Sequence, residues 1–248
     1  MVPDRLVAQR FYSELFGWEF TDDDSEETGF YSNAMVNGQP AAGIGQVPPE
    51  AGMPPVWTTN LATDDAAATV DKATAAGGQV LVPATSVEDF GTFAVLQDPT
   101  GAVFGLWQSG THTGANVVNE PNTVIWNQAM SRDPQATLAF YQEVFDMTST
   151  DMSGEGMVFH TLEVDGNTVG GLGGIPDEMP AEVPAHWQVF FAVDDADATI
   201  AKAQELGGTS LGEAVDTPFG RMAQLMGPSG EPFSIIKPPA DQEPDQSR

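Results

Sequence analysis

In the second half of the chain, hydrophobic residues recur at helical spacing in some segments and at strand-like spacing in others. Leu138, Tyr141 and Phe145 recur at helical spacing behind Asp133, a typical N-cap residue. A second helix is predicted to begin after Asp195, by the same capping signal. Alternating or continuous apolar runs predict strands at 123–131, 157–164, 168–175, 184–193, 209–213, 221–226 and 232–237. The order strand, helix and three strands is therefore predicted twice in this half.

The chain also repeats itself at an offset of about 129 residues. The matching pairs are Phe11-Tyr12 with Phe140-Tyr141, Trp57 with Trp187, and Asp98-Pro-Thr-Gly101 with Gly227-Pro-Ser-Gly230. Two homologous domains are predicted at 1–110 and 122–238, with a linker at 111–121 and a polar, proline-rich tail at 239–248 that we expect to be disordered.

The first domain lacks the opening strand of the second. At the repeat offset, the run 123–131 maps onto positions before Met1 and reaches no farther than Val2. Either the natural chain is longer or another chain completes this sheet, and we favour the former, because a bare sheet edge invites foreign pairing.

The amino-acid composition limits the kinds of partner that this chain can bind. With 8 basic and 36 acidic residues, the net charge is −28, which argues against nucleic acid. The longest apolar runs are far shorter than a membrane span, and the N-terminus has no signal-like segment, so we expect a cytoplasmic protein, monomeric or homodimeric, that does not bind membranes. The acidity fits a salt-adapted host or an ordinary acidic protein, and both interpretations stay open.

The Phe-Tyr pair inside the first helix, the Asp-Pro-x-Gly turn before the last strand and the element order resemble the vicinal oxygen chelate superfamily of glyoxalases, bleomycin resistance proteins and dioxygenases. The tandem arrangement is most similar to actinobacterial two-domain glyoxalase-like proteins. The resemblance implies an α+β fold in which each domain pairs two βαβββ modules into a cupped mixed sheet. It also implies a ligand on the concave face.

Catalytic members of this family hold a divalent metal with His and Glu side chains. Carried over onto this chain, the metal-binding positions of the second domain fall on Trp126, Gln188 and Ser234, and those of the first domain on Thr58 and Gly105, with the opening position absent. Zinc, iron and nickel sites need several imidazole or carboxylate donors. We therefore predict no metal and no other cofactor.

Alternation along the strands predicts the ligand-binding residues. The second cup is lined by Trp126, Gln128, Met130, Gln188, Phe190, Ser234 and Ile236, and the first by Thr58, Asn60 and Trp107. An indole, a phenyl ring and two amides suit a small, flat, polar ligand, although the same Trp126 could simply fill a closed core.

Three other features have simple structural explanations. His112, His160 and His186 each lack the neighbours of a metal site, and His160, on a strand that could face the cup, is the one weak candidate for an acid or base. The glycines at 170–174 lack the spacing of a phosphate loop and are predicted to relieve crowding in a curved sheet. The acidic run 22–27 is predicted to be a solvated loop, with loose cation binding as the alternative.

Two classes of function follow. The first is a metal-independent protein that binds a small molecule in one or both cups. The second is a glyoxalase-like lyase or isomerase acting on a small oxo compound, using His160, Gln188 or Glu120. An interaction protein with a functional acidic surface is a third, weaker hypothesis.

Overall fold

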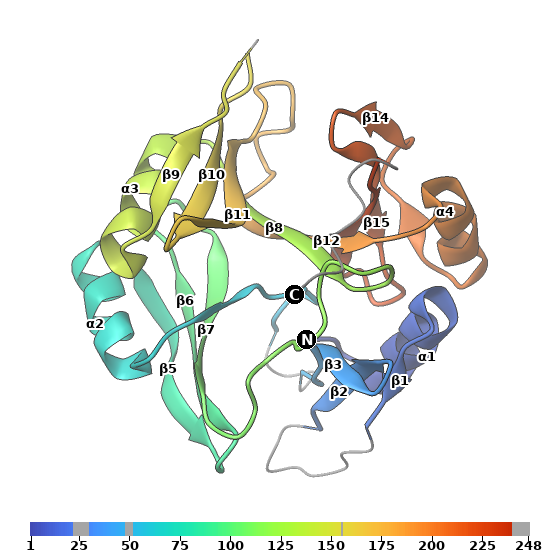
Figure 1. Ribbon diagram of the computed structural model, residues 1–248, viewed down its shortest axis with the longest axis horizontal. Coiled ribbons are helices and arrows are strands. Elements are labelled where there is room, and N and C mark those ends of the chain that lie inside the picture. The colour runs from blue at the N-terminus through green and yellow to red at the C-terminus, as the bar shows by residue number, and fades with distance from the viewer. Residues whose placement is uncertain (22–29, 48–51, 155, 240–248) are drawn as a thin grey trace. The chain divides into compact units, whose positions relative to one another are not determined.

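The computed structural model describes residues 1–21, 30–47, 52–154 and 156–239. The acidic run at 22–27 and nearly all of the predicted tail lie outside these residues. The fold is α+β with mixed sheets, as predicted (Figure 1). None of the described helices combines the length and the apolar character that a membrane crossing requires.

The predicted order of strand, helix and three strands is confirmed in the third module, and the fourth follows it with one additional short strand. The third module consists of β8 (Val124–Ser131), α3 (Pro134–Phe145), β9 (Thr148–Asp151), β10 (Phe159–Val164) and β11 (Asn167–Gly174). The fourth consists of β12 (His186–Ala192), α4 (Ala196–Glu205), β13 (Thr209–Ser210), β14 (Val215–Thr217), β15 (Gly220–Met226) and β16 (Pro232–Lys237). The alternation did not reveal β9, whose residues are almost all polar, and it missed the separate short strand β14.

The first half repeats this order with a shortened start. The second module consists of β4 (Asn60–Ala62), α2 (Ala66–Ala75), β5 (Gln79–Val87), β6 (Gly91–Gln97) and β7 (Val103–Ser109). The first consists of α1 (Arg5–Phe16), β1 (Glu19–Phe20), β2 (Ser32–Val36) and β3 (Gln39–Ile44). In place of an opening strand, the first module has a single parallel bridge between Val2 and Gln46.

The four helices in the described part of the chain begin in the same way. Asp4, Asp65, Asp133 and Asp195 are N-caps, and each side chain accepts a hydrogen bond from the backbone N–H three residues later. Such a bond satisfies one of the donors that a helix start leaves free. The repeat in the sequence is thus also a repeat of local hydrogen bonding.

The compact units of the structure do not follow the sequence repeats. One unit comprises Met1–Trp57, Gly114–Ile125 and Val189–Arg248, and the other comprises Thr58–Thr113 and Trp126–Gln188. We call them unit 1 and unit 2. Each unit joins one module of the first repeat to one of the second, so the ranges 1–110 and 122–238 describe repeats rather than compact bodies.

Each unit has its own apolar core. In unit 1, Phe11, Phe16 and Trp18 of the first module pack with Phe191 and Phe233 of the fourth. In unit 2, the cluster combines second-module residues such as Ala73, Leu96 and Phe104 with third-module residues such as Tyr141, Leu162 and Leu172. Because apolar side chains of both modules are buried in one cluster, contact between modules defines the units.

Candidate functional site

In unit 2, one face of the third-module sheet carries three of the predicted ligand-binding residues, all of them on β8. Its strands lie in the order β8-β11-β10-β9. The core residues Ala129, Leu162 and Leu172 lie on the side packed against α3. Successive side chains alternate between the faces of a strand, so Trp126, Gln128 and Met130 of β8 lie on the opposite side. We call that side the open face.

Three polar groups on the open face form a chain of hydrogen bonds. Trp126 Nε1 donates to Gln128 Oε1 over 3.1 Å, and Gln128 Nε2 donates to Gln188 Oε1 over 3.1 Å. The three side chains are half-buried. The structure therefore brings together three of the predicted residues, in unit 2, as one indole-amide-amide array.

Two glycines of β11 provide the space for the aromatic residues of this face. A Cβ at Gly171 would come within 2.6 Å of Phe159 and 2.9 Å of Trp126, and one at Gly173 within 2.9 Å of Met130 Sδ. Such distances are shorter than real Cβ contacts allow. The prediction that these glycines relieve crowding is confirmed, and Phe159 joins the site as an aromatic residue that the sequence analysis missed.

The structure corrects the assignment of His160 to the cup. Phe159 approaches Gly171 on the open face, so His160, the next residue of β10, lies on the side of Leu162 and α3. Its side chain is 8% exposed. His160 is therefore not placed to exchange protons with a molecule on the open face.

The other predicted residues lie in different surroundings. Phe190 of β12 and Ser234 of β16 belong to unit 1, pair in register, and are only 7% and 1% exposed. In unit 2, the Oδ1 of Asn60 lies over Gly105, whose missing side chain leaves it room, and Trp107 Nε1 donates to the carbonyl of His112 over 2.9 Å. A ligand can reach Asn60 directly, but Ser234 is closed to solvent.

The residues at the positions where the resemblance implies metal ligands do not fit a divalent metal. The indole N–H of Trp126 can only donate, and it is already directed at Gln128. The Gln128 amide is shared between Trp126 and Gln188. Among the described residues, no group of three or more His, Asp or Glu side chains comes together as a metal site.

The open face also carries a carboxylate that the sequence analysis did not select. Glu163 of β10 accepts hydrogen bonds from Thr150 and Thr161 on Oε1, over 2.7 and 3.0 Å, and from Thr148 on Oε2, over 3.4 Å. These bonds hold the pKa of the carboxyl below its ordinary value. The alternation of Thr161 and Glu163 with apolar residues in β10 was the signal available in the sequence. It could not reveal the two hydrogen-bond donors on β9, Thr148 and Thr150.

Deeper in unit 2, a buried chain of polar groups joins Trp187, Tyr141 and Asp98. Trp187 Nε1 donates to Tyr141 Oη over 2.7 Å, and Tyr141 Oη donates to Asp98 Oδ2 over 3.3 Å. The other oxygen, Oδ1, accepts from three backbone N–H groups and the Thr100 hydroxyl, over 2.7–3.0 Å. Burial raises the pKa of Tyr141 well above its ordinary value. All these polar groups are satisfied, which fits a structural role.

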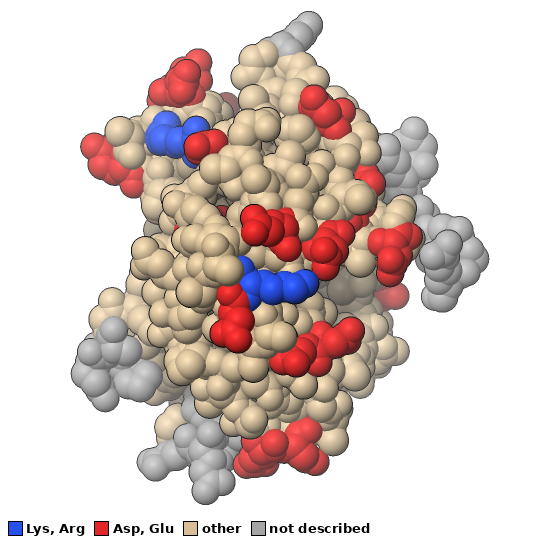
Figure 2. Space-filling view, turned by 90° about the vertical axis from the view of Figure 1, so that its left-hand side faces the viewer, with Lys and Arg blue, Asp and Glu red and all other residues tan. Residues whose placement is uncertain are grey.

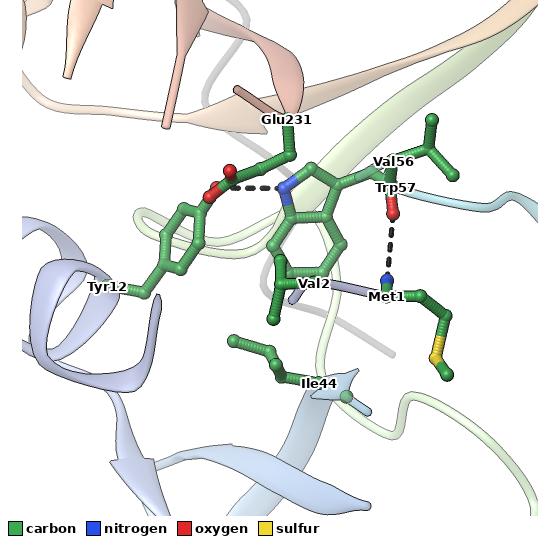
Figure 3. A pocket seen from close by; sticks show the side chains of 8 residues that line it. Met1, Val2, Tyr12, Ile44, Val56, Trp57 and Glu231 are labelled. Atoms are coloured by element: carbon green, nitrogen blue, oxygen red, sulfur yellow. Dashed lines mark hydrogen bonds between the residues drawn. The ribbon is translucent and has the colours of Figure 1, made fainter. Parts of the chain in front are cut away.

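Unit 1 contains a matching chain with a different carboxylate. Trp57 Nε1 donates to Tyr12 Oη over 3.0 Å, Tyr12 Oη donates to Glu231 Oε1 over 3.1 Å, and Ser229 N donates to Glu231 Oε2 over 3.0 Å. Figure 3 shows these side chains around a cavity of about 10 Å³, which is enough for one water molecule. The residue at the repeat position of Asp98 is Gly227, and a Cβ there would clash with the Glu231 carboxylate.

Burial raises the pKa of the Glu231 carboxyl, against hydrogen bonds from its own backbone, Tyr12 and Ser229. The folded state therefore favours the protonated acid. The resulting stabilisation is present below the ordinary Glu pKa of about 4.3 and is lost as the pH rises through the higher folded pKa.

Glu231→Gln cannot ionise, so we expect the wild type to lose stability relative to this variant as the pH rises from about 4, near the ordinary Glu pKa, towards neutrality. Urea unfolding of both proteins across this range measures the difference. A difference independent of pH would contradict this expectation.

Negative charge dominates the surface. Figure 2 shows Asp and Glu side chains spread over the face of the molecule that it presents, with few Lys or Arg side chains among them. This agrees with the net charge of −28. Such a surface attracts cations over long range at low ionic strength.

Comparison with known proteins connects both repeats to one family. The model of the Glyoxalase/Bleomycin resistance protein/Dioxygenase superfamily matches residues 128–235, and that of the glyoxalase-like domain matches residues 2–107. CFP32 of Mycobacterium tuberculosis, which bears a provisional glyoxylase name, is 45% identical over 244 residues, which cover 96% of this chain and 92% of that protein. The anthracycline biosynthesis protein DnrV of Streptomyces peucetius is 33% identical over 248 residues, covering 95% and 90%.

A solved structure supports the fold. The Mn(II)-bound glyoxalase of Novosphingobium aromaticivorans aligns with a TM-score of 0.63 at 15% identity, covering 95% of this chain and 79% of that one. At this identity the likeness concerns the fold and not the chemistry.

Proposed function

Because the chain belongs to the glyoxalase, bleomycin resistance protein and dioxygenase superfamily, we propose that it is a small-molecule binding protein whose ligand lies on the open face without a metal. One observation carries the proposal. Trp126 and Gln188, at positions where the resemblance implies metal ligands, are joined through Gln128 into a chain of hydrogen bonds. Such a chain offers a ligand an aromatic surface and two amides, but offers a metal no cluster of imidazole and carboxylate donors.

The side chains of the open face suit a flat molecule with carbonyl or hydroxyl groups. Trp126 and Phe159 meet over Gly171 and provide aromatic surface at a low entropic cost. The amides of Gln128 and Gln188 both donate and accept hydrogen bonds, so they can orient such groups. The name of the Streptomyces peucetius relative points in the same direction, since anthracyclines are fused-ring compounds that carry carbonyls and hydroxyls.

Phe190 and Ser234 remain candidates for ligand binding within unit 1. Thr58, Asn60 and Trp107 remain candidates for a second site in unit 2. Their surroundings support this less strongly, because Ser234 is closed to solvent and Trp107 is held by the carbonyl of His112.

Trp126→Ala tests the proposal. We expect metal-depleted wild-type protein to bind a dihydroxyanthraquinone, and this variant to bind it at least about 10-fold more weakly, because the main aromatic surface is removed. Isothermal titration calorimetry measures both affinities. Phe90→Ala, which removes an aromatic ring exposed on a turn of unit 2, is the matched control and is expected to bind like the wild type.

Binding that depends on added metal, or that is unchanged in Trp126→Ala, would overturn the proposal. Mass spectrometry of protein incubated with zinc, nickel, iron or manganese and then freed of loosely bound ions gives a second readout. A stoichiometric metal would contradict metal independence.

The alternative function is a glyoxalase-like lyase or isomerase acting on a small oxo compound. The observation in its favour is the glyoxylase name of the 45% identical relative. Turnover of an aldehyde or dicarbonyl by the purified protein, lost in Gln188→Ala, would favour this alternative over simple binding.

A further inference from the structure

Glu163 is a carboxylate set in place by neighbours on the open face. Thr161, two residues earlier on β10, and Thr148 and Thr150 on the adjacent β9 all direct hydroxyl groups at it. Two of these bonds converge on Oε1, while Oε2 receives only the longest, at 3.4 Å. A carboxylate oxygen can accept more than one hydrogen bond, so Oε2 keeps capacity for a donor from a ligand.

No basic side chain neutralises this carboxylate among the described ion pairs. Those pairs join Lys72 to Asp146, Lys202 to Glu14, and Arg221 to Asp197 and Asp216. Glu163 is only half-buried, so a ligand can reach it. The threonine hydroxyls favour the ionised form without cancelling its charge.

The carboxylate lies two residues along its strand from the aromatic part of the open face. Gln128 of β8 and Thr161 of β10 both pair with Gly171 of β11, which the rings of Trp126 and Phe159 approach. Glu163 of β10 pairs with Thr168 of β11. β11 lies between β8 and β10, so these two strands are about two strand spacings apart, or ~10 Å, and Trp126 and Glu163 lie on the same face of the sheet.

We propose that Glu163 binds the positively charged group of the ligand, so that the open face selects flat aromatic molecules that carry an amine. This inference rests on the proposed function and adds a ligand class to it. Trp126 and Phe159 contact the rings, the amides of Gln128 and Gln188 orient polar substituents, and Glu163 accepts hydrogen bonds from an ammonium group. A fused-ring amine can span the separation.

Two probes of equal ring size test this selection. Naphthylmethylamine is a cation at neutral pH, and naphthylmethanol is its neutral counterpart. We expect the wild type to bind the amine about 5-fold more tightly than the alcohol, as measured by calorimetry. In Glu163→Gln we expect the preference to disappear, with the affinity for the alcohol unchanged.

The strongly negative protein attracts any cation, so the control removes one charge elsewhere. Glu143→Gln changes an exposed glutamate of α3, the helix that covers the opposite side of the sheet. We expect this variant to keep the 5-fold preference. An equal loss of preference in both variants would show a general charge effect and would overturn the role of Glu163.

Dihydroxyanthraquinone separates the two proposals. If it binds and the wild type shows no preference for the amine, the role of Glu163 is overturned while the proposed function stands. If neither it nor either naphthyl probe binds, the proposed function fails and this inference fails with it. Circular dichroism of Glu163→Gln verifies that the sheet is intact.

Discussion

Replacing Asp98 with alanine is expected to lower the free energy of unfolding by about 4 kcal/mol. The carboxylate is 3% exposed and accepts five hydrogen bonds, from the N–H groups of Thr100, Gly101 and Ala102, the Thr100 hydroxyl and the Tyr141 phenol. Alanine leaves several buried donors without an acceptor, and each such donor costs free energy.

Urea denaturation followed by circular dichroism measures this loss. Asp89→Ala, which removes an exposed carboxylate of the neighbouring turn, is the matched control and is expected to stay within about 0.5 kcal/mol of the wild type. A loss below about 1 kcal/mol for Asp98→Ala would show that water or other groups replace the carboxylate.

The second large effect concerns the corresponding carboxylate of unit 1. Glu231→Ala is expected to cost about 3 kcal/mol, because the buried Tyr12 hydroxyl and Ser229 N–H lose their acceptor. Gly227→Asp alone is expected to cost as much, because its side chain enters the space that the Glu231 carboxylate already occupies.

The double variant Gly227→Asp with Glu231→Ala reproduces the pattern of Asp98 and Ala102 in the other repeat. We expect it to lie within about 1 kcal/mol of the wild type, so the two changes compensate each other strongly. Urea unfolding of the wild type, the two single variants and the double variant completes the double-mutant cycle. If the losses of unfolding free energy are additive, the Glu231 carboxylate does not have in unit 1 the structural role that Asp98 has in unit 2. Gly212→Ala, at an open position, is the control for adding a Cβ to a glycine.

The repeated order of helices and strands could be predicted from the sequence because it depends on residues that are close together in the chain. The N-cap residue Asp133 and the helical spacing behind it determine α3, and alternation determines β8, β10 and β11 to within about two residues. Alternation also placed Trp126 and Gln128 on one face of β8, where the structure has them. Gln188 joins them there by a hydrogen bond.

Alternation could not decide which face of β10 contacts α3. His160 and Glu163 lie on opposite faces because they are three residues apart on β10, with Phe159, Thr161 and Glu163 on the open face. Shifting the assumed alternation by one residue exchanges the two faces, and with them a buried histidine and a half-buried carboxylate that a ligand can reach. His160, the weak candidate named from the sequence, therefore lies on the buried face, and Glu163, which the sequence did not single out, lies on the open face.

The sequence by itself determined the internal repeat, the element order of the second half and the helix starts after Asp133 and Asp195, because each depends on residue type and near neighbours. Only the tertiary structure decided the composition of the two compact units and the contacts of Glu163 with β9. It also decided that Glu231 fills the space left by Gly227. These features depend on packing between residues far apart in the chain, and neither periodicity nor spacing encodes such packing directly.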